Sequence, residues 1–144
     1  VLFIDVDDFK FINDRFGHSV GDEVIKYVAG CIKQRVKGSG FAGRFGGDEF
    51  VLCITDPKQI EEIESLSLDL IDELYEGYHS ELANVSINVK ASIGIAFYPE
   101  HGDDSNKVVA AADEAMYFVK KNGKANYHIY QPEDSEMEDL QHTL

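Results

Sequence analysis

Three acidic residues stand where short apolar runs of the sequence end or begin. Asp5 follows the apolar residues 1–4, and Asp48 and Glu49 follow the pair Gly46 and Gly47 between two further apolar runs. Mg²⁺ binds proteins through one or two carboxylates and completes its octahedron with water and phosphate oxygens, an arrangement that serves phosphoryl transfer. The glycines would let the backbone approach a ligand with no Cβ in the way. The pattern therefore indicates a metal site for a phosphate-bearing ligand.

The same acids also have a plainer interpretation. Asp48 and Glu49 could form an ordinary polar hairpin tip, and Asp5 could be an ordinary strand end. Residue types and spacing alone leave the two interpretations open.

Apolar periodicity predicts the elements that must position these acids. Residues 1–5 predict a buried strand, and apolar residues at helical spacing predict a helix over 22–37 that stops at glycines 38 and 40. Residues 41–45 and 50–54 predict a β-hairpin, in which Gly46 and Gly47 would supply the positive φ of a tight turn. A second helix is predicted from Pro57 to about residue 76, with an acidic outer face.

The second half of the chain continues the alternation of strands and helices. Alternating apolar residues over 87–97 predict a half-buried strand, ended by Pro99. A third helix over 108–119 closes at Gly123, and residues 127–130 predict a last strand. The order predicts an α+β fold with a ferredoxin-like βαββαβ core, an added αβ unit, and an antiparallel central sheet with helices on one face. The first strand is central there, so Asp5 could meet the hairpin acids.

Composition limits the partners that this chain can have. The 144 residues suffice for one domain, and 13 Lys and Arg against 27 Asp and Glu give a net charge of −14. This charge disfavours binding to a nucleic acid polymer or an anionic membrane surface, and it leaves open a small anion carried by metal ions. No apolar stretch is long enough to span a membrane. Residues 1–131 are predicted to form the domain and 132–144 an acidic tail or the start of a linker.

Four ordered blocks of sequence resemble a known family. The segment from Arg44 to Phe50, which reads RFGGDEF, resembles the GGDEF signature of bacterial diguanylate cyclases. The other blocks are DVDDFK with Asn13 and Asp14, FGH with Gly21 and Asp22, and SIGI followed by ADEAMY. The resemblance extends from residue 1 to about residue 130.

The resemblance implies an activity and its metal ligands. Two GTP molecules would condense to cyclic di-GMP with loss of two pyrophosphates, in a site similar to a nucleotidyl cyclase or polymerase palm with two Mg²⁺ or Mn²⁺ ions. Asp5 and Asp48 are implied as metal carboxylates and Val6 as a ligand through its carbonyl. Glu49 is implied as a further ligand or as the group that assists deprotonation of the ribose 3′-hydroxyl, which makes Asp48 and Glu49 the catalytic acids.

The resemblance also implies contacts to the nucleotide. Asn13 and Asp22 would bind guanine, although a turn residue and a helix N-terminal acid are plainer explanations. Lys120 and Lys124, at the end of the third helix, would bind phosphate; the alternative is that their charges complement the helix dipole. The implied phosphate contacts are Asp8, Phe9, Lys10, Gly47, Lys120 and Lys124.

Two departures from the family pattern bear on regulation. The positions of the Arg-x-x-Asp product-inhibition motif hold Lys37, Gly38, Ser39 and Gly40, which predicts no inhibitory product site there. The helix and the Asp-x-Leu-Thr-Gly-Leu-x-Asn-Arg type segment that normally precede the first strand are missing, so we expect a fragment of a longer protein.

The resemblance implies partners as well. Catalysis would need a homodimer of domains, each loaded with GTP. Sensor or phosphodiesterase domains are expected in a cytoplasmic parent chain that missing segments could anchor to a membrane. The alternative is a catalytically silent GTP-binding domain that regulates an attached cyclic di-GMP phosphodiesterase domain.

Overall fold

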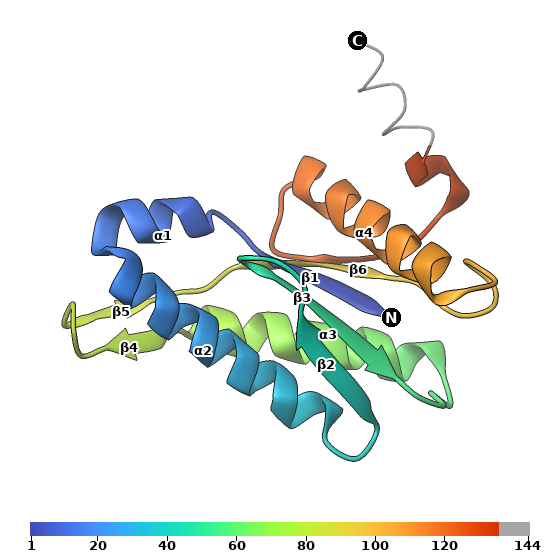
Figure 1. Cartoon of the computed structure of the whole chain (residues 1–144), viewed down its shortest axis with the longest axis horizontal. Coiled ribbons are helices and arrows are strands. Elements are labelled where there is room, and N and C mark those ends of the chain that lie inside the picture. The colour runs from blue at the N-terminus through green and yellow to red at the C-terminus, as the bar shows by residue number, and fades with distance from the viewer. Residues whose placement is uncertain (136–144) are drawn as a thin grey trace, which may run out of the picture.

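The computed structural model describes residues 1–135 and shows a five-stranded sheet in the order β2-β3-β1-β6-β7 (Figure 1). All neighbouring strands are antiparallel except β6 and β7, which are parallel. The central place of β1 and its pairing with β3 and β6 confirm the predicted ferredoxin-like order. The strands are β1 (Leu2–Val6), β2 (Gly40–Arg44), β3 (Glu49–Ile54), β6 (Ala91–Ile95) and β7 (Tyr127–Ile129), with a separate hairpin of β4 (Tyr78–Ser80) and β5 (Val85–Ile87).

Helices cover both faces of the sheet, so the prediction of helices on one face is wrong. The helices are α1 (Phe9–Phe16), α2 (His18–Val36), α3 (Ile60–Glu76) and α4 (Ser105–Lys121). Leu2 and Ile4 of β1 pack in the large core cluster with α2 and α3, whereas Phe3 packs with α4 on the other face. In Figure 1, α4 lies on the opposite side of the sheet from α2 and α3.

Strand β6 was predicted to be half-buried, but a helix also covers its other face, which carries only small residues. All five residues of β6 are buried, not alternate ones. A Cβ at Gly94 would lie 1.9 Å from the carbonyl oxygen of Ala112 and 2.2 Å from the amide nitrogen of Met116. Helix α4 therefore rests directly on the strand backbone. Ser92, Gly94 and Ala96 resemble the polar half of an alternating pattern, but they form the contact surface for a helix.

Several local predictions also differ from the structure. Residues 9–16, which carried no predicted helix, form α1, and the predicted helix over 22–37 begins earlier, at His18. The predicted strand over 87–97 is interrupted at residues 88–90, between β5 and β6. The hairpin of β2 and β3 is confirmed, but neither Gly46 nor Gly47 has a positive φ. The turn is wider than expected, with the Phe45 and Gly46 amides both donating to the Glu49 carbonyl.

The C-terminal part of the described chain packs on the domain. Residues 132–135 are helical, and Asp134 is 5% exposed, where its carboxylate accepts hydrogen bonds from the Gln131 amide and lies 3.1 Å from His128 Nε2. Of these four residues, Asp134 is buried and Pro132 and Glu133 are exposed; the acidic tail over 132–144 stays a prediction, and residues 136–144 lie outside the described part.

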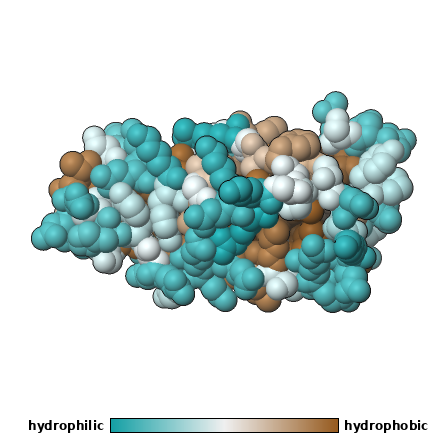
Figure 2. Space-filling view, turned by 90° about the horizontal axis from the view of Figure 1, so that it is seen from below, coloured by the Kyte–Doolittle hydropathy of each residue, from teal (hydrophilic) through white to brown (hydrophobic). Residues whose placement is uncertain are grey.

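The acidic surface lies mainly outside the site. Figure 2 shows a mostly hydrophilic face with hydrophobic side chains gathered in one area. The exposed acids of α3 confirm its predicted acidic outer face: Glu61, Glu62, Asp69, Asp72 and Glu76. Within residues 1–135, no helix has the length and apolar character needed to cross a bilayer.

Candidate active site

Pairing of β1 with β3 brings the three predicted metal-site acids together. Asp5 lies opposite Glu49 in the antiparallel register, and the Val6 amide donates to the Asp48 carbonyl at 3.0 Å. Residues directly opposite in such a ladder have Cβ atoms about 5 Å apart. The end of the central strand and the hairpin tip therefore form one acidic edge. Asp5 and Asp48 are 43 positions apart in the sequence, so only strand pairing shows that they meet.

The Asp5 carboxyl is held in an unfavourable environment. Its Oδ1 is buried and has no hydrogen-bond partner among the described residues. The pKa of Asp5 is raised to about 7: burial is the largest cause, the Lys120 ammonium opposes it, and the negative charges of Asp48 and Glu49 add to the rise. The Lys120 Nζ lies 3.6 Å from Asp5 Oδ1. A carboxyl that is partly buried, crowded by like charge and short of donors is a group that a cation would stabilise.

This edge fits a divalent cation that is bound together with a ligand. Within residues 1–135 there is no group of three or more His, Cys, Asp and Glu side chains arranged to hold a metal ion by themselves. Mg²⁺ commonly takes only one or two protein carboxylates and fills its other positions with water and phosphate oxygens. The unpartnered oxygen of Asp5 and the adjacent Asp48 and Glu49 match that requirement.

Arg44 holds the hairpin tip in shape. Its Nε donates to the carbonyl oxygens of Gly46 and Gly47 at 3.0 and 3.1 Å, and its Nη2 also donates to Gly47. A Cβ added at Gly47 would meet nothing within 4 Å, so the space beside this residue is open. The Arg44 guanidinium therefore holds the turn through the carbonyl oxygens of Gly46 and Gly47. The space beside the Gly47 Cα remains open to a ligand. Sequence patterns did not indicate this role for Arg44.

The two predicted guanine-binding residues lie at the junction of α1 and α2. The Asn13 side chain lies over Gly21, where an added Cβ would be 1.8 Å from Asn13 Oδ1. Asp22 follows directly in the chain and is exposed on α2. The absence of a side chain at Gly21 therefore lets Asn13 lie beside the start of α2, on which Asp22 stands.

The predicted phosphate-binding residues collect near the acidic edge. Lys120 ends α4, and Lys124 lies just beyond it with its Nζ 2.8 Å from Asp8 Oδ1. Their hydrogen bond is the main cause that lowers the pKa of Asp8 and raises the pKa of Lys124. Phe9 and the exposed Lys10 begin α1, where first-turn amides have no acceptor within the helix and can bind an anion.

Comparison with known proteins identifies the family. A family model described as diguanylate cyclase, GGDEF domain, matches residues 1–126. The chain belongs to the GGDEF domain family. The bifunctional diguanylate cyclase/cyclic di-GMP phosphodiesterase MucR of Pseudomonas aeruginosa is 35% identical over 131 residues, which are 91% of this chain and 19% of MucR. The diguanylate cyclase DosC of Escherichia coli is 34% identical over 131 residues, which are 90% of this chain and 28% of DosC.

A solved structure of the family has the same fold. The GGDEF domain of YfiN (TpbB) from Pseudomonas aeruginosa superposes with a TM-score of 0.91 at 30% identity, covering 96% of this chain and 80% of that one. The fold prediction is therefore confirmed as a mixed α+β domain with a mostly antiparallel sheet. This GGDEF domain spans less than a third of the length of MucR or DosC.

Sequence reasoning missed the second acid of the first block. Asp7 is 3% exposed, and its carboxylate accepts hydrogen bonds from the side chains of Ser92 and Lys120 and from the Ala125 amide. These partners lie 85 or more positions away. The only sign of Asp7 in the sequence was its place as a second acid just after a buried strand of the GGDEF domain. Such a place does not show whether the carboxylate faces solvent or protein.

The last position of the product-inhibition motif is closely packed, whereas the first three are exposed. A Cβ at Gly40 would lie 1.9 Å from the carbonyl oxygen of Cys53 on the neighbouring strand, and Lys37 is exposed. An acid at position 40 would therefore require the backbone to move. The expectation that this GGDEF domain binds no product there stays a prediction.

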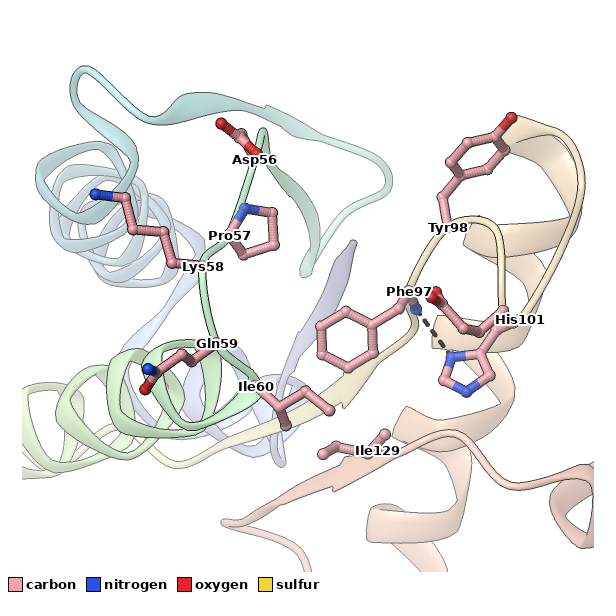
Figure 3. Close-up of a pocket in the computed structure, with 10 residues that line it drawn as sticks. Asp56, Pro57, Lys58, Gln59, Ile60, Phe97, Tyr98, His101 and Ile129 are labelled. Atoms are coloured by element: carbon pink, nitrogen blue, oxygen red, sulfur yellow. Dashed lines mark hydrogen bonds between the residues drawn. The ribbon is translucent and has the colours of Figure 1, made fainter.

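A separate hollow of about 560 Å³ lies away from the acids. In Figure 3, Phe97, Ile60 and Ile129 lie toward one another at its centre, and the Phe97 amide donates to His101 Nδ1. An adjoining hollow is lined by Val1 and Leu2, at the opposite end of β1 from Asp5. Two acids, Asp56 and Glu100, line the first hollow beside one lysine, so it does not suit a triphosphate.

Proposed function

We propose that this GGDEF domain condenses two GTP molecules to cyclic di-GMP. The observation that carries the proposal is the Asp5 carboxyl, whose buried Oδ1 has no partner beside Asp48 and Glu49. Family membership supports it because DosC, which is 34% identical, is named a diguanylate cyclase. The intact sequence from Gly46 to Phe50 retains both hairpin acids of the signature.

In this proposal the acids hold Mg²⁺ or Mn²⁺, with the Val6 carbonyl as a further ligand. The bound metal ions lower the pKa of the ribose 3′-hydroxyl and neutralise charge on the transferring phosphate. Asp5 and Asp48 bind the metal through their carboxylates. Glu49 serves as a further ligand or accepts the proton of the 3′-hydroxyl.

The proposed nucleotide contacts come from three places in the fold. Lys120, Lys124 and the backbone of residues 8–10 would bind the phosphates, and Gly47 would let the triphosphate pass close to the hairpin. Asn13 and Asp22 would bind guanine. A hollow of about 310 Å³ between α2 and the hairpin is lined by apolar residues such as Ile25, one turn after Asp22, and by basic ones such as Lys26, and its place on α2 supports the proposed guanine contact of Asp22.

The reaction requires two copies of the domain. The 3′-oxygen of the GTP on one domain attacks the α-phosphorus of the GTP on the other, the bond to the β-phosphate breaks, and pyrophosphate leaves with its electron pair. Repeating the step with the roles exchanged closes the ring. A homodimer with two-fold symmetry places the two sites face to face.

The experiment incubates the chain with GTP and Mg²⁺ and separates the nucleotides by chromatography. We expect cyclic di-GMP and pyrophosphate from the unaltered chain and neither from Asp48→Ala or Glu49→Ala. Asp103→Ala is the matched control, because Asp103 is exposed and pairs only with the exposed Lys107. Turnover that persists in both hairpin variants would overturn the assignment of the acids.

The second candidate is a GTP-binding domain without turnover that regulates an attached phosphodiesterase. It is favoured by PdeR of Escherichia coli, which is 32% identical over 133 residues, is named only a cyclic di-GMP phosphodiesterase, and is covered by this chain over 20% of its length. GTP binding without product by the unaltered chain and by a longer parent chain would support it over the cyclase. In both cases the domain would act in the cytoplasm, where GTP is available.

A further inference from the structure

The Asp7 carboxylate joins three segments of the fold at one buried point. Its Oδ1 accepts hydrogen bonds from Lys120 Nζ at 2.5 Å and from Ser92 Oγ at 2.7 Å, and its Oδ2 accepts one from the Ala125 amide at 2.9 Å. The side chain has no exposed surface. The end of β1 is thereby joined to β6, to the last turn of α4 and to the loop after it.

Asp7 sets the position of the Lys120 ammonium. Lys120 lies 2.5 Å from Asp7 but 3.6 Å from Asp5, so its short charge-assisted hydrogen bond goes to Asp7. A lysine side chain is flexible and its charge is compact, so a single buried carboxylate can select where the ammonium stands. The Lys120 side chain remains 20% exposed, and its Nζ lies 3.6 Å from Asp5 Oδ1 at the acidic edge.

The same carboxylate holds the loop that carries Lys124. Lys124 and Ala125 have φ values of 62° and 50°, two consecutive left-handed conformations in residues other than glycine. Such a backbone costs free energy unless other contacts stabilise it. The hydrogen bond from the Ala125 amide to Asp7 is such a contact, and it directs the loop so that Lys124 reaches Asp8.

These contacts distinguish Asp7 from the metal-site acids. Both of its oxygens are engaged inside the protein, whereas Asp5 has an oxygen without a partner. We propose that Asp7 is a positioning residue that places Lys120 and Lys124 as a fixed pair of cations for the outer phosphates of the nucleotide. This inference rests on the proposed binding of GTP, and it concerns which residue organises the phosphate contacts.

The test compares the affinities of Asp7→Asn for a non-cyclising GTP analogue and for GMP, by calorimetry on the full chain with Mg²⁺. Since the two lysines would contact the outer phosphates, we expect the triphosphate to bind about tenfold more weakly and GMP to bind with unchanged affinity. Lys120→Ala should give the same selective loss, and the double variant should lose less than the sum of the two single losses, because only the placement of Lys124 is left to lose. A general loss of folding would not change the ratio of the two affinities.

The matched control is Asp134→Asn, which removes another buried carboxylate paired with a basic side chain, His128, outside the proposed site. It should leave the ratio unchanged. If Asp7→Asn does not fold, Ser92→Ala keeps the carboxylate and removes one of its donors, and it should give a smaller loss that is again confined to the triphosphate.

The outcomes separate this inference from the proposed function. Equal weakening of GTP analogue and GMP by Asp7→Asn or Ser92→Ala, or full additivity with Lys120→Ala, would make Asp7 a purely structural residue and overturn the inference. Failure of the unaltered chain to bind either nucleotide would instead overturn the proposed function and, with it, this role of Asp7.

Discussion

Asp5 and Asp7 are two positions apart at the end of β1, yet their surroundings are opposite. Asp7 has no exposed side-chain surface and three hydrogen bonds from within the protein. Asp5 keeps 19% of its side chain exposed, has one buried oxygen without a partner, and has a pKa raised to about 7, mainly by burial. A satisfied buried carboxylate stabilises a fold, whereas an unsatisfied one stores free energy that a ligand can recover.

Asp5 and Asp7 look alike in the sequence, but their surroundings point to different roles. Asp5 stands at the edge where a cation and phosphates would bind, and Asp7 organises the lysines behind it. We therefore expect substitutions at Asp5 to affect chemistry, and substitutions around Asp7 and α4 to affect stability and geometry.

The largest effect is expected from Asp5→Asn. Loss of the charged ligand should lower the rate of cyclic di-GMP formation by more than about a hundredfold, because removing even an indirect partner of a metal costs about ten- to a hundredfold. The midpoint of thermal unfolding should not fall at neutral pH, because the neutral amide removes a crowded charge. Turnover close to that of the unaltered chain would remove Asp5 from the metal site.

The next largest effect is expected from Gly94→Val, which inserts a side chain between β6 and the α4 backbone. Overpacking of this kind costs about 1–3 kcal/mol, and here the neighbours are backbone atoms at 1.9 and 2.2 Å that must move. Denaturant unfolding measures the loss. The control is Gly30→Ala in α2, where an added Cβ meets nothing within 4 Å and about 0.5–1 kcal/mol of stability should be gained. Equal effects at the two glycines would contradict the packing described for α4.

A smaller effect is expected in the pH dependence of stability. Because folding raises the pKa of Asp5 from 3.8 to about 7, its neutral form contributes stability below pH 3.8, and this contribution is lost as the pH rises through 7. In EDTA, the thermal midpoint of the unaltered chain should fall relative to that of Asp5→Asn between pH 4 and pH 8. Mg²⁺ with a GTP analogue should reverse the fall, because metal binding needs the deprotonated carboxyl. Parallel curves in EDTA would contradict the crowded environment of Asp5.

The smallest effect is expected from Asp8→Asn. The side chains of Asp8 and Lys124 are 58% and 41% exposed, and solvent screens such surface pairs so that they contribute little to stability. Chemical denaturation should therefore show little change, in contrast to Asp7→Asn, which removes the charge from a buried carboxylate. A loss at Asp8 as large as that at Asp7 would mean that burial does not separate the two acids.

Much of the fold could be predicted because apolar periodicity reports burial directly. The strands at both ends of the chain, the hairpin of β2 and β3, and the sheet order followed from such runs. Asp48 and Glu49 were found in the GGDEF signature and Asp5 in the DVDDFK block, and the pairing of Asp5 with Glu49 confirms that the two blocks lie together. The helix α1 was missed because it is only eight residues long, and of its four apolar residues only Ile12 is buried.

The sequence by itself determined the family, the order of the strands and the identity of the acids, because these depend on local pattern and on residue types at fixed spacing. Only the tertiary structure decided that α4 lies on the second face of the sheet, that Arg44 binds the carbonyls of its own turn, and that Asp7 is enclosed while Asp5 is open. The physical reason is that burial and hydrogen-bond satisfaction depend on partners such as Ser92 and Lys120, which lie far away in the chain and approach only when the sheet and α4 assemble.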